Sequence, residues 1–367
     1  MNEDKKIEER LPENGTLPEE LDARSGGNKV SSTILFVIIA ALSVWAVTGQ
    51  WKQFSLLSFT RFLSRANAGW ITLAVLSMLG FIVFEGLALR SACQALHCPA
   101  PVLKSCKWAA TDIYFSAITP SATGGQPACA LVMMRDAIPG VVTTAALLLT
   151  LAMYSLSILT IGAASLLLQP DVFMDFGALS RVLIAVGFAA QAGLFTLFAM
   201  LVKNERLLEK LAGAVYRLLG KLRLIRHADK KLERLHASME EYGHLAELLS
   251  GHRDLIARSF LFNLLQRLSQ IAVTGFAYLA MGGRLSRVPE VMAMQSYVVI
   301  GSCCVPVPGA VGVADYLMLD GFGAFLPVDL AVSMELLSRA LSFYSCVLIC
   351  GIIVFITYRR KKKGSAK

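Results

Sequence analysis

Helix-breaking residues and hydrogen-bonding side chains are concentrated in one short stretch of the sequence, 119–127 (TPSATGGQP). Pro120 and Pro127 lack a backbone N–H and end helices, while Gly124 and Gly125 permit backbone angles that other residues avoid. The polar side chains of the stretch are those of Thr119, Ser121, Thr123 and Gln126. A helix that begins beyond such a turn presents unpaired N–H groups and a partial positive charge, which suit a phosphate. The stretch therefore predicts either an anion-binding turn or a structural kink that binds nothing.

A second stretch of the same type, 305–312 (VPVPGAVG), occurs in the C-terminal half of the chain. Its helix-breaking residues are Pro306, Pro308, Gly309 and Gly312. An acid, Asp315, follows three residues after the last glycine. The same two interpretations apply here: a turn that binds a headgroup, or a kink.

Ionisable side chains also fall inside apolar segments, where a buried charge costs several kcal/mol and is usually paired or functional. They are Glu85, Asp112, Arg267, Glu335 and Arg339. Arg267 is the best candidate for a lipid phosphate, because a guanidinium binds phosphate through two parallel hydrogen bonds. Glu335 and Arg339 have the i, i+4 spacing of an intrahelical ion pair. They either neutralise each other during membrane insertion or contact a ligand.

The roles of two further charged residues, Asp315 and Arg135, stay open. Asp315, together with Glu335, could meet a cationic headgroup or carry a coupling proton. Arg135 follows the first helix-breaking stretch and either contacts the substrate or, like Arg90 and Arg258, marks the cytoplasmic edge of the membrane.

The composition requires a membrane around these residues. Of the 367 residues, 55% are hydrophobic and 17% are charged, and the mean hydropathy is +0.59. Soluble domains are about 45–50% apolar and about 25% charged. Since a helical span takes about 20 predominantly apolar residues, the chain is predicted to be an all-α polytopic membrane protein. Six full spans are predicted, at 32–48, 69–89, 138–168, 179–202, 255–281 and 330–358.

The two helix-breaking stretches lie in segments that do not behave as ordinary spans, 108–136 and 290–327. Each consists of two short apolar pieces around a Pro/Gly break, and each piece is too short to cross a bilayer as a helix. With six full spans, the first segment begins and ends inside the cell and the second begins and ends outside. They are therefore predicted to be opposed re-entrant broken helices, as in transporters whose substrate site lies near the bilayer midplane.

The polar segments complete the organisation. Residues 1–29 are predicted to be a disordered cytoplasmic tail, 30–202 and 255–358 the two halves of the membrane domain, and 359–367 a basic cytoplasmic tail. Residues 203–254 are predicted to form basic amphipathic helices on the cytoplasmic membrane surface, and 51–67 an interfacial amphipathic helix. The basic segments fall on one side of a bacterial inner membrane if both termini are cytoplasmic.

Other functional classes lack support in the sequence. The net charge of +9 shows no basic face interleaved with aromatic residues, so a nucleic-acid partner is not expected. Cys93, His97, Cys98 and Cys106 are close in sequence but fit no usual zinc spacing, and no metal or other cofactor is expected. No Cys/His or His/Asp constellation lies at the predicted membrane face, so the chain is not expected to be an enzyme by itself.

The two breaks carry a resemblance to a known family. The pattern I-T-P-x-x-x-G-G-Q-P at 118–127, followed by Arg135, resembles the flippase-like membrane domain of lysylphosphatidylglycerol synthases. The pattern P-x-P-G-x-x-G at 306–312, followed by an acid, is similar to the second motif of that family, and Arg339 with Tyr344 also agrees. The sequence departs at Ala310, where the family usually has glycine, and at Asp315, where it often has glutamate. The resemblance covers about 32–358.

The resemblance implies that the chain moves a phospholipid between leaflets, with an aminoacylated phosphatidylglycerol as the substrate that the family name indicates. The soluble synthase domain of the family is not expected in this chain. Two alternatives stay open. In one, the chain is the membrane component of a phosphatidylglycerol lysyltransferase system whose soluble aminoacyltransferase is encoded separately. In the other, it is a membrane scaffold that transports nothing.

Overall fold

The computed structural model describes residues 66–119, 122–204, 206–211, 213–214, 252–303, 305, 307–310 and 312–364. All regular structure within these residues is helical, which confirms the all-α prediction. The predictions for 1–29, for the first span at 32–48 and for most of 51–67 and 203–254 lie outside the described residues, as does the end of the basic C-terminal tail.

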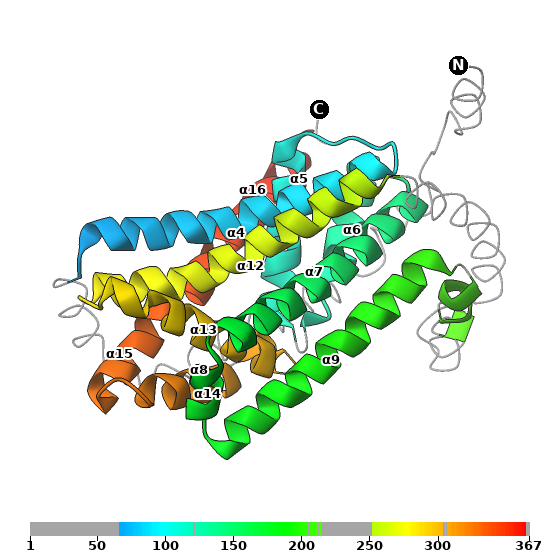
Figure 1. The fold of residues 1–367 in the computed structure, drawn as a ribbon. Coiled ribbons are helices and arrows are strands. Elements are labelled where there is room, and N and C mark those ends of the chain that lie inside the picture. The colour runs from blue at the N-terminus through cyan, green and yellow to red at the C-terminus, as the bar shows by residue number, and fades with distance from the viewer. Residues whose placement is uncertain are drawn as a thin grey trace. The chain divides into compact units, whose positions relative to one another are not determined.

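Two long helices, α4 (Ala68–Ala95) and α12 (Arg253–Ala280), run antiparallel and in contact along much of their length (Figure 1). The backbone N–H of Asn67, at the start of α4, donates to the carbonyl of Ala280, at the end of α12, at 3.0 Å. Asn67 also begins α4 locally, because its side chain accepts a hydrogen bond from the N–H of Gly69 at 2.9 Å. This helix pair carries Glu85 and Arg267.

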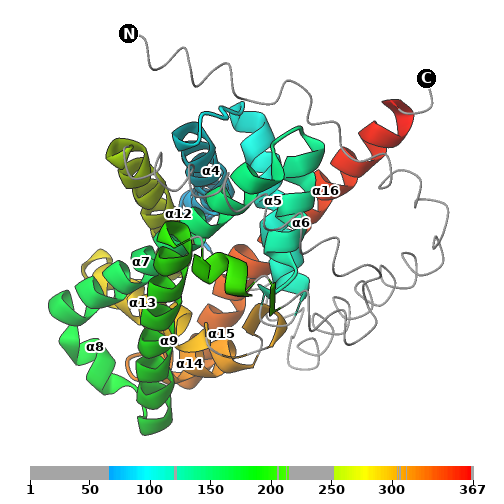
Figure 2. The same cartoon turned by 90° about the vertical axis from the view of Figure 1, so that its right-hand side faces the viewer.

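A second antiparallel pair consists of α7 (Gly140–Leu168) and α9 (Ala178–Lys203), joined by the short helix α8 (Pro170–Asp175) (Figures 1 and 2). Helix α13 (Val288–Ser302) packs against both. A Cβ at Gly187 in α9 would lie 2.1 Å from the carbonyl oxygen of Ile300 in α13. Only glycine permits this approach of two helix backbones, which is typical of packing between membrane helices.

Four helical stretches in the described part of the chain are long and apolar enough to cross a membrane: Ala68–Ala95, Gly140–Leu168, Ala178–Val202 and Leu330–Thr357. They coincide with four of the six predicted spans. Helix α12 covers a fifth but is not one of the four, since polar residues such as Asn263, Gln266 and Arg267 interrupt it. The total of six spans stays a prediction.

Both predicted breaks interrupt helices. Helix α5 (Val102–Ile118) ends just before Thr119, and α6 (Gly125–Arg135) begins at Gly125. In the second segment, α13 is followed by the turn η5 (Pro308–Ala310) and then by α14 (Val313–Gly323). The interruption of the helices is observed. Their entry into the membrane from opposite faces stays a prediction.

The last membrane segment is one helix with a wide turn inside it. Helix α15 (Val328–Arg339) continues through η6 (Ala340–Tyr344), a π-helical turn, into α16 (Ser345–Gly364). Turns of this type widen the helix locally and often occur at functional sites. Here the turn directly follows Arg339, one of the predicted site residues.

Large apolar side chains on the outer helices are exposed, as expected of surfaces that face lipid. Leu76 of α4, Val182 of α9 and Leu348 of α16 each expose more than half of their surface. Soluble proteins rarely expose contiguous apolar surface of this kind. The ionisable residues of the predicted site in α4, α5, α12 and α15 are buried where the helices meet.

Candidate functional site

The first break brings the start of α6 against the middle of α5. A Cβ at Gly125, the first residue of α6, would lie 1.9 Å from Ser116 Oγ and 2.1 Å from Asp112 Oδ1. Thr119 fixes the turn, because its hydroxyl donates to the carbonyl of Phe115 at 2.7 Å and accepts from the N–H of Gly124 at 2.9 Å. Glycine at 125 is therefore required for the Asp112 carboxyl group to lie at the N-terminal end of α6.

Asp112 takes two side-chain hydrogen bonds at this position. Gln126 Nε2 of α6 donates to Asp112 Oδ2 at 2.6 Å, and Ser116 Oγ donates to Oδ1 at 3.1 Å. A carboxylate at a helix N-terminus is stabilised by the unpaired N–H groups and the helix dipole. The sequence predicted that this helix N-terminus could bind a phosphate. In the structure the carboxyl group of Asp112 lies beside it.

Asp112 has a second acid beside it, Glu85 of α4. A side-chain hydrogen bond joins their two carboxyl groups, and Gln266 Nε2 of α12 donates to Glu85 Oε2 at 2.7 Å. The approach of the two helices depends on Gly86, since a Cβ there would lie 2.9 Å from the backbone of Cys106 in α5. Four helices therefore meet at a buried pair of acids.

Arg267 lies next to this pair, in a slot between aromatic rings. Its guanidinium carbon is 4.1 Å from the centroid of the Tyr154 ring and 5.5 Å from that of Phe81. Its Nη1 donates to Gln270 Oε1, and its charge attracts Glu85. Among the described residues, its Nε has no hydrogen-bond partner. Arg267 thus keeps one donor uncommitted in a buried position.

The second break also places an acid at a helix N-terminus. Gly312, in the left-handed region with φ 85°, donates its N–H to Asp315 Oδ2 at 2.8 Å and so begins α14. Gly309, with φ 60°, packs against Phe343 of the π-helical turn, where a Cβ would lie 2.3 Å from the ring. Both glycines occupy positions that other residues adopt with strain.

Arg339 joins this second acid to the break. Its Nε lies 2.8 Å from Asp315 Oδ1, and its Nη2 donates to the carbonyl of Gly309 at 3.3 Å. Its guanidinium carbon is 5.0 Å from the centroid of the Phe343 ring. Glu335 interacts with Asp315 as well. The ion pair of Arg339 is therefore made across helices with Asp315, and the intrahelical spacing with Glu335 did not indicate it.

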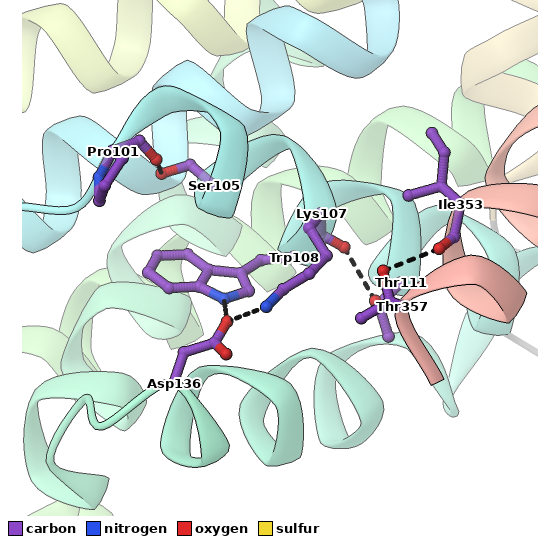
Figure 3. A network of polar contacts seen from close by, with 8 residues as sticks. All are labelled: Pro101, Ser105, Lys107, Trp108, Thr111, Asp136, Ile353 and Thr357. Carbon is purple, nitrogen blue, oxygen red and sulfur yellow. Dashed lines mark hydrogen bonds and ion pairs between the residues drawn. The ribbon is translucent and has the colours of Figure 1, made fainter. Parts of the chain in front are cut away.

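The far ends of α5 and α6 are tied together by a polar network (Figure 3). Asp136, directly after α6, pairs with Lys107 and accepts a hydrogen bond from the indole Nε1 of Trp108 at 2.7 Å. Trp108 is fully buried. The network joins the first part of α5 to the end of α6, away from the break. It was not predicted from the sequence. The signal available was the position of Lys107, Trp108 and Asp136 at the ends of the two apolar pieces.

The predicted site residues thus form two groups and a remainder. The structure gathers Thr119, Gly124, Gly125 and Gln126 at the first break, and Gly309, Gly312, Asp315, Glu335 and Arg339 at the second. Arg267 lies beside Glu85. Pro308 begins η5, while Pro120, Ser121 and Pro306 lie outside the described residues. Arg135 is in the last turn of α6, at the opposite end from the break.

Helix α5 contacts η5, so the two breaks are neighbours in the fold. Each consists of a helix N-terminus, an aspartate beside a buried glutamate, and a buried arginine next to aromatic rings. In the residues that the structure describes, no three His, Cys, Asp or Glu side chains are arranged to hold a metal ion. A cavity of about 390 Å³ at the end of α12, lined among others by Tyr278, Arg284 and Arg287, includes none of these break residues.

Comparison with known proteins adds one result. The family model described as the lysylphosphatidylglycerol synthase TM region matches residues 33–350, which include both breaks and all of the charged residues around them. No curated protein matches the chain.

Proposed function

The chain belongs to the family of lysylphosphatidylglycerol synthase transmembrane regions, and from this premise we propose that it moves a phospholipid between the two leaflets of a membrane. The observation that carries the proposal is the pair of adjacent helix breaks, each with an aspartate, a buried glutamate and a buried arginine around it. The two breaks form the headgroup site. An aminoacylated phosphatidylglycerol is the substrate class that the family name favours.

Burial makes these charges costly unless they act on a ligand or on each other. Backbone groups released by a helix break must also be satisfied by protein, water or ligand. An aminoacylated phosphatidylglycerol has a phosphate and an ammonium group, so it needs cations and acids in one site. Arg267 and Arg339 would bind the phosphate, and the acids Asp112 and Asp315 would bind the ammonium.

Movement of the lipid requires the two breaks to open in turn. The left-handed glycines at 309 and 312 and the π-helical turn at 340–344 lie where such a change would occur. The headgroup would enter at one break and leave at the other while the acyl chains stay in the surrounding lipid. We place the protein in a bacterial inner membrane with both termini cytoplasmic, on the distribution of basic residues.

The direct test is reconstitution into liposomes that contain headgroup-labelled phosphatidylglycerol, lysyl-phosphatidylglycerol or phosphatidylethanolamine. Exchange is followed with a membrane-impermeant quencher. We expect faster exchange of one lipid class with the protein present, and loss of this acceleration in Gly125→Leu and in Arg267→Ala.

Two matched variants control for general damage. Gly193→Leu adds the same side chain where nothing lies within 4 Å, and Arg258→Ala removes an exposed arginine from the same helix as Arg267. Both should exchange lipid as the unmodified protein does. If Gly125→Leu and Arg267→Ala are folded and exchange every lipid at the unmodified rate, the proposal is wrong.

A second candidate function follows from the family description, which names a synthase. The chain would then be the membrane component of a phosphatidylglycerol lysyltransferase system with a soluble aminoacyltransferase as its partner. Co-expression with such an enzyme, followed by extraction and chromatography of lipids, tests this function. Lysyl-phosphatidylglycerol that accumulates only when both proteins are present would favour it over transport.

A further inference from the structure

Glu85, Asp112 and Arg267 form a buried group of charges beside the first break, here termed the acid cluster. Each of the three side chains is 8% exposed, and they come from α4, α5 and α12. With both acids ionised, the cluster has one negative charge in excess, in surroundings where an unbalanced charge is costly. One proton on the acid pair makes the three side chains neutral as a set.

The contacts around the acids also favour a proton between them. Gln266 donates to Glu85 and Gln126 donates to Asp112, each through an amide N–H. Ser116 donates to the other oxygen of Asp112 through its hydroxyl. A further contact joins one carboxyl group to the other. Ionised carboxylates are acceptors only, and two of them in contact repel. One proton on the pair replaces this repulsion by a hydrogen bond between the two carboxyl groups.

Two buried polar groups in and beside the acid cluster have unused hydrogen-bonding capacity. Gln266 is 1% exposed, and its Oε1 has no partner among the described residues, nor has Arg267 Nε. Gln266 Oε1 is an acceptor and can take the hydrogen of a protonated carboxyl group. Arg267 Nε is a donor and can take an oxygen of a phosphate.

We propose that the Glu85–Asp112 pair is a proton-binding site, and that a proton crosses the membrane together with each phospholipid. The inference rests on the proposed transport function. When both acids are ionised, the Asp112 carboxylate at the N-terminus of α6 repels an anionic headgroup. When the pair holds its proton, this helix end and Arg267 are available to the lipid phosphate. Proton and phosphate therefore bind at the same time.

Other titratable groups act on the pair from the helices packed around it. They are Cys129 of α6, Tyr154 of α7, Arg267 of α12, and Cys346 and Cys350 of α16. Thiols and phenols are uncharged at neutral pH in their ordinary range, so Arg267 is the charged member of this set. The proton on the pair then depends on Arg267 and on the phosphate that Arg267 binds.

The test has two independent measurements on the full chain. Infrared absorption of the carbonyl stretch of protonated carboxyl groups is compared at neutral pH between the unmodified protein and the double variant Glu85→Gln/Asp112→Asn. We expect the double variant to lose part of this absorption. Asp254→Asn, which changes an exposed acid at the start of α12, should leave it unchanged.

The second measurement uses proteoliposomes of phosphatidylcholine, in which acyl-labelled phosphatidylglycerol is only a trace component, and a gradient of about one pH unit. One proton per lipid drives the label toward an about tenfold ratio between leaflets, because one pH unit corresponds to a tenfold equilibrium. Asp254→Asn should respond in the same way, and the double variant should show no gradient-driven asymmetry.

The outcomes separate the two proposals. Exchange that ignores the gradient in the unmodified protein, or an infrared spectrum that the double variant leaves unchanged, overturns proton coupling alone. Absence of exchange for every lipid without a gradient overturns the transport function and the coupling with it, while the infrared comparison still reports whether the acid pair holds a proton.

Discussion

Arg339 forms its ion pair with Asp315 of the neighbouring helix, 2.8 Å from Nε to Oδ1, although Glu335 precedes it by one turn on its own helix. The pair links the start of α14 to the end of α15, and Arg339 also reaches the carbonyl of Gly309. One guanidinium thus holds the second break to the last membrane helix.

Replacing Arg339 by alanine is expected to destabilise the protein by about 3 kcal/mol, because it leaves the partly buried carboxylate of Asp315 without its cation. Thermal unfolding in detergent measures the effect. The double variant Arg339→Ala/Asp315→Asn should regain part of the loss, since it also removes the charge. A double variant that is less stable than Arg339→Ala by the full cost of Asp315→Asn would contradict the pairing.

Gly125→Ala is expected to destabilise the first break by roughly 1–3 kcal/mol, the usual cost of forcing extra atoms into a packed site. The added Cβ would overlap Ser116 Oγ and Asp112 Oδ1, so α6 must shift away from α5. The melting temperature in detergent is compared with that of Gly193→Ala. Equal melting temperatures for the two variants would show that α5 and α6 are not in close contact at Gly125.

Asp136→Ala should loosen the open end of the first broken segment. It removes the partner of Lys107 and leaves the buried indole N–H of Trp108 unsatisfied, which costs about 1–3 kcal/mol. Asp175→Ala, at an exposed position in α8, is the matched control. Limited proteolysis and thermal unfolding check the result. An Asp136→Ala variant as stable as Asp175→Ala would show that the network does not stabilise this end of the segment.

Cysteine labelling tests the opposed orientation of the breaks. Cys303, which follows α13, is exposed, and Ala122 in the first turn is exposed as well. In a chain whose other cysteines are replaced, an impermeant maleimide should label Cys303 from outside the cell. A cysteine introduced by Ala122→Cys should react only from the cytoplasmic side. Labelling of both from one side would contradict the six-span arrangement.

The positions of both breaks could be predicted from the sequence because proline and glycine act locally. Pro308 and Gly309 end regular helix wherever the chain places them, and the long apolar runs predict helices by length and composition. The partners of the buried charges could not be predicted. Asp112 meets Glu85 because Gly86 lets α4 approach α5, and that approach exists only in the folded protein.

The same limit explains why the ion-pair partner of Arg339 could not be predicted. Helical spacing pointed to Glu335, which lies on the same helix, because spacing rules describe isolated helices. Asp315 reaches Arg339 through the left-handed turn at Gly312, which sets the start of α14. The family resemblance indicated that these residues matter and gave no contact between them.

The π-helical turn at Ala340–Tyr344 changes the angular phase of the last helix. An α-helix advances about 100° per residue, so in a regular helix Arg339 and Cys346, seven residues apart, would point in nearly the same direction. The wide turn rotates one relative to the other. Arg339 therefore faces the second break, while Cys346 and Cys350 pack with α4 and α5. The last helix therefore contacts the second break before the wide turn and the first broken segment after it.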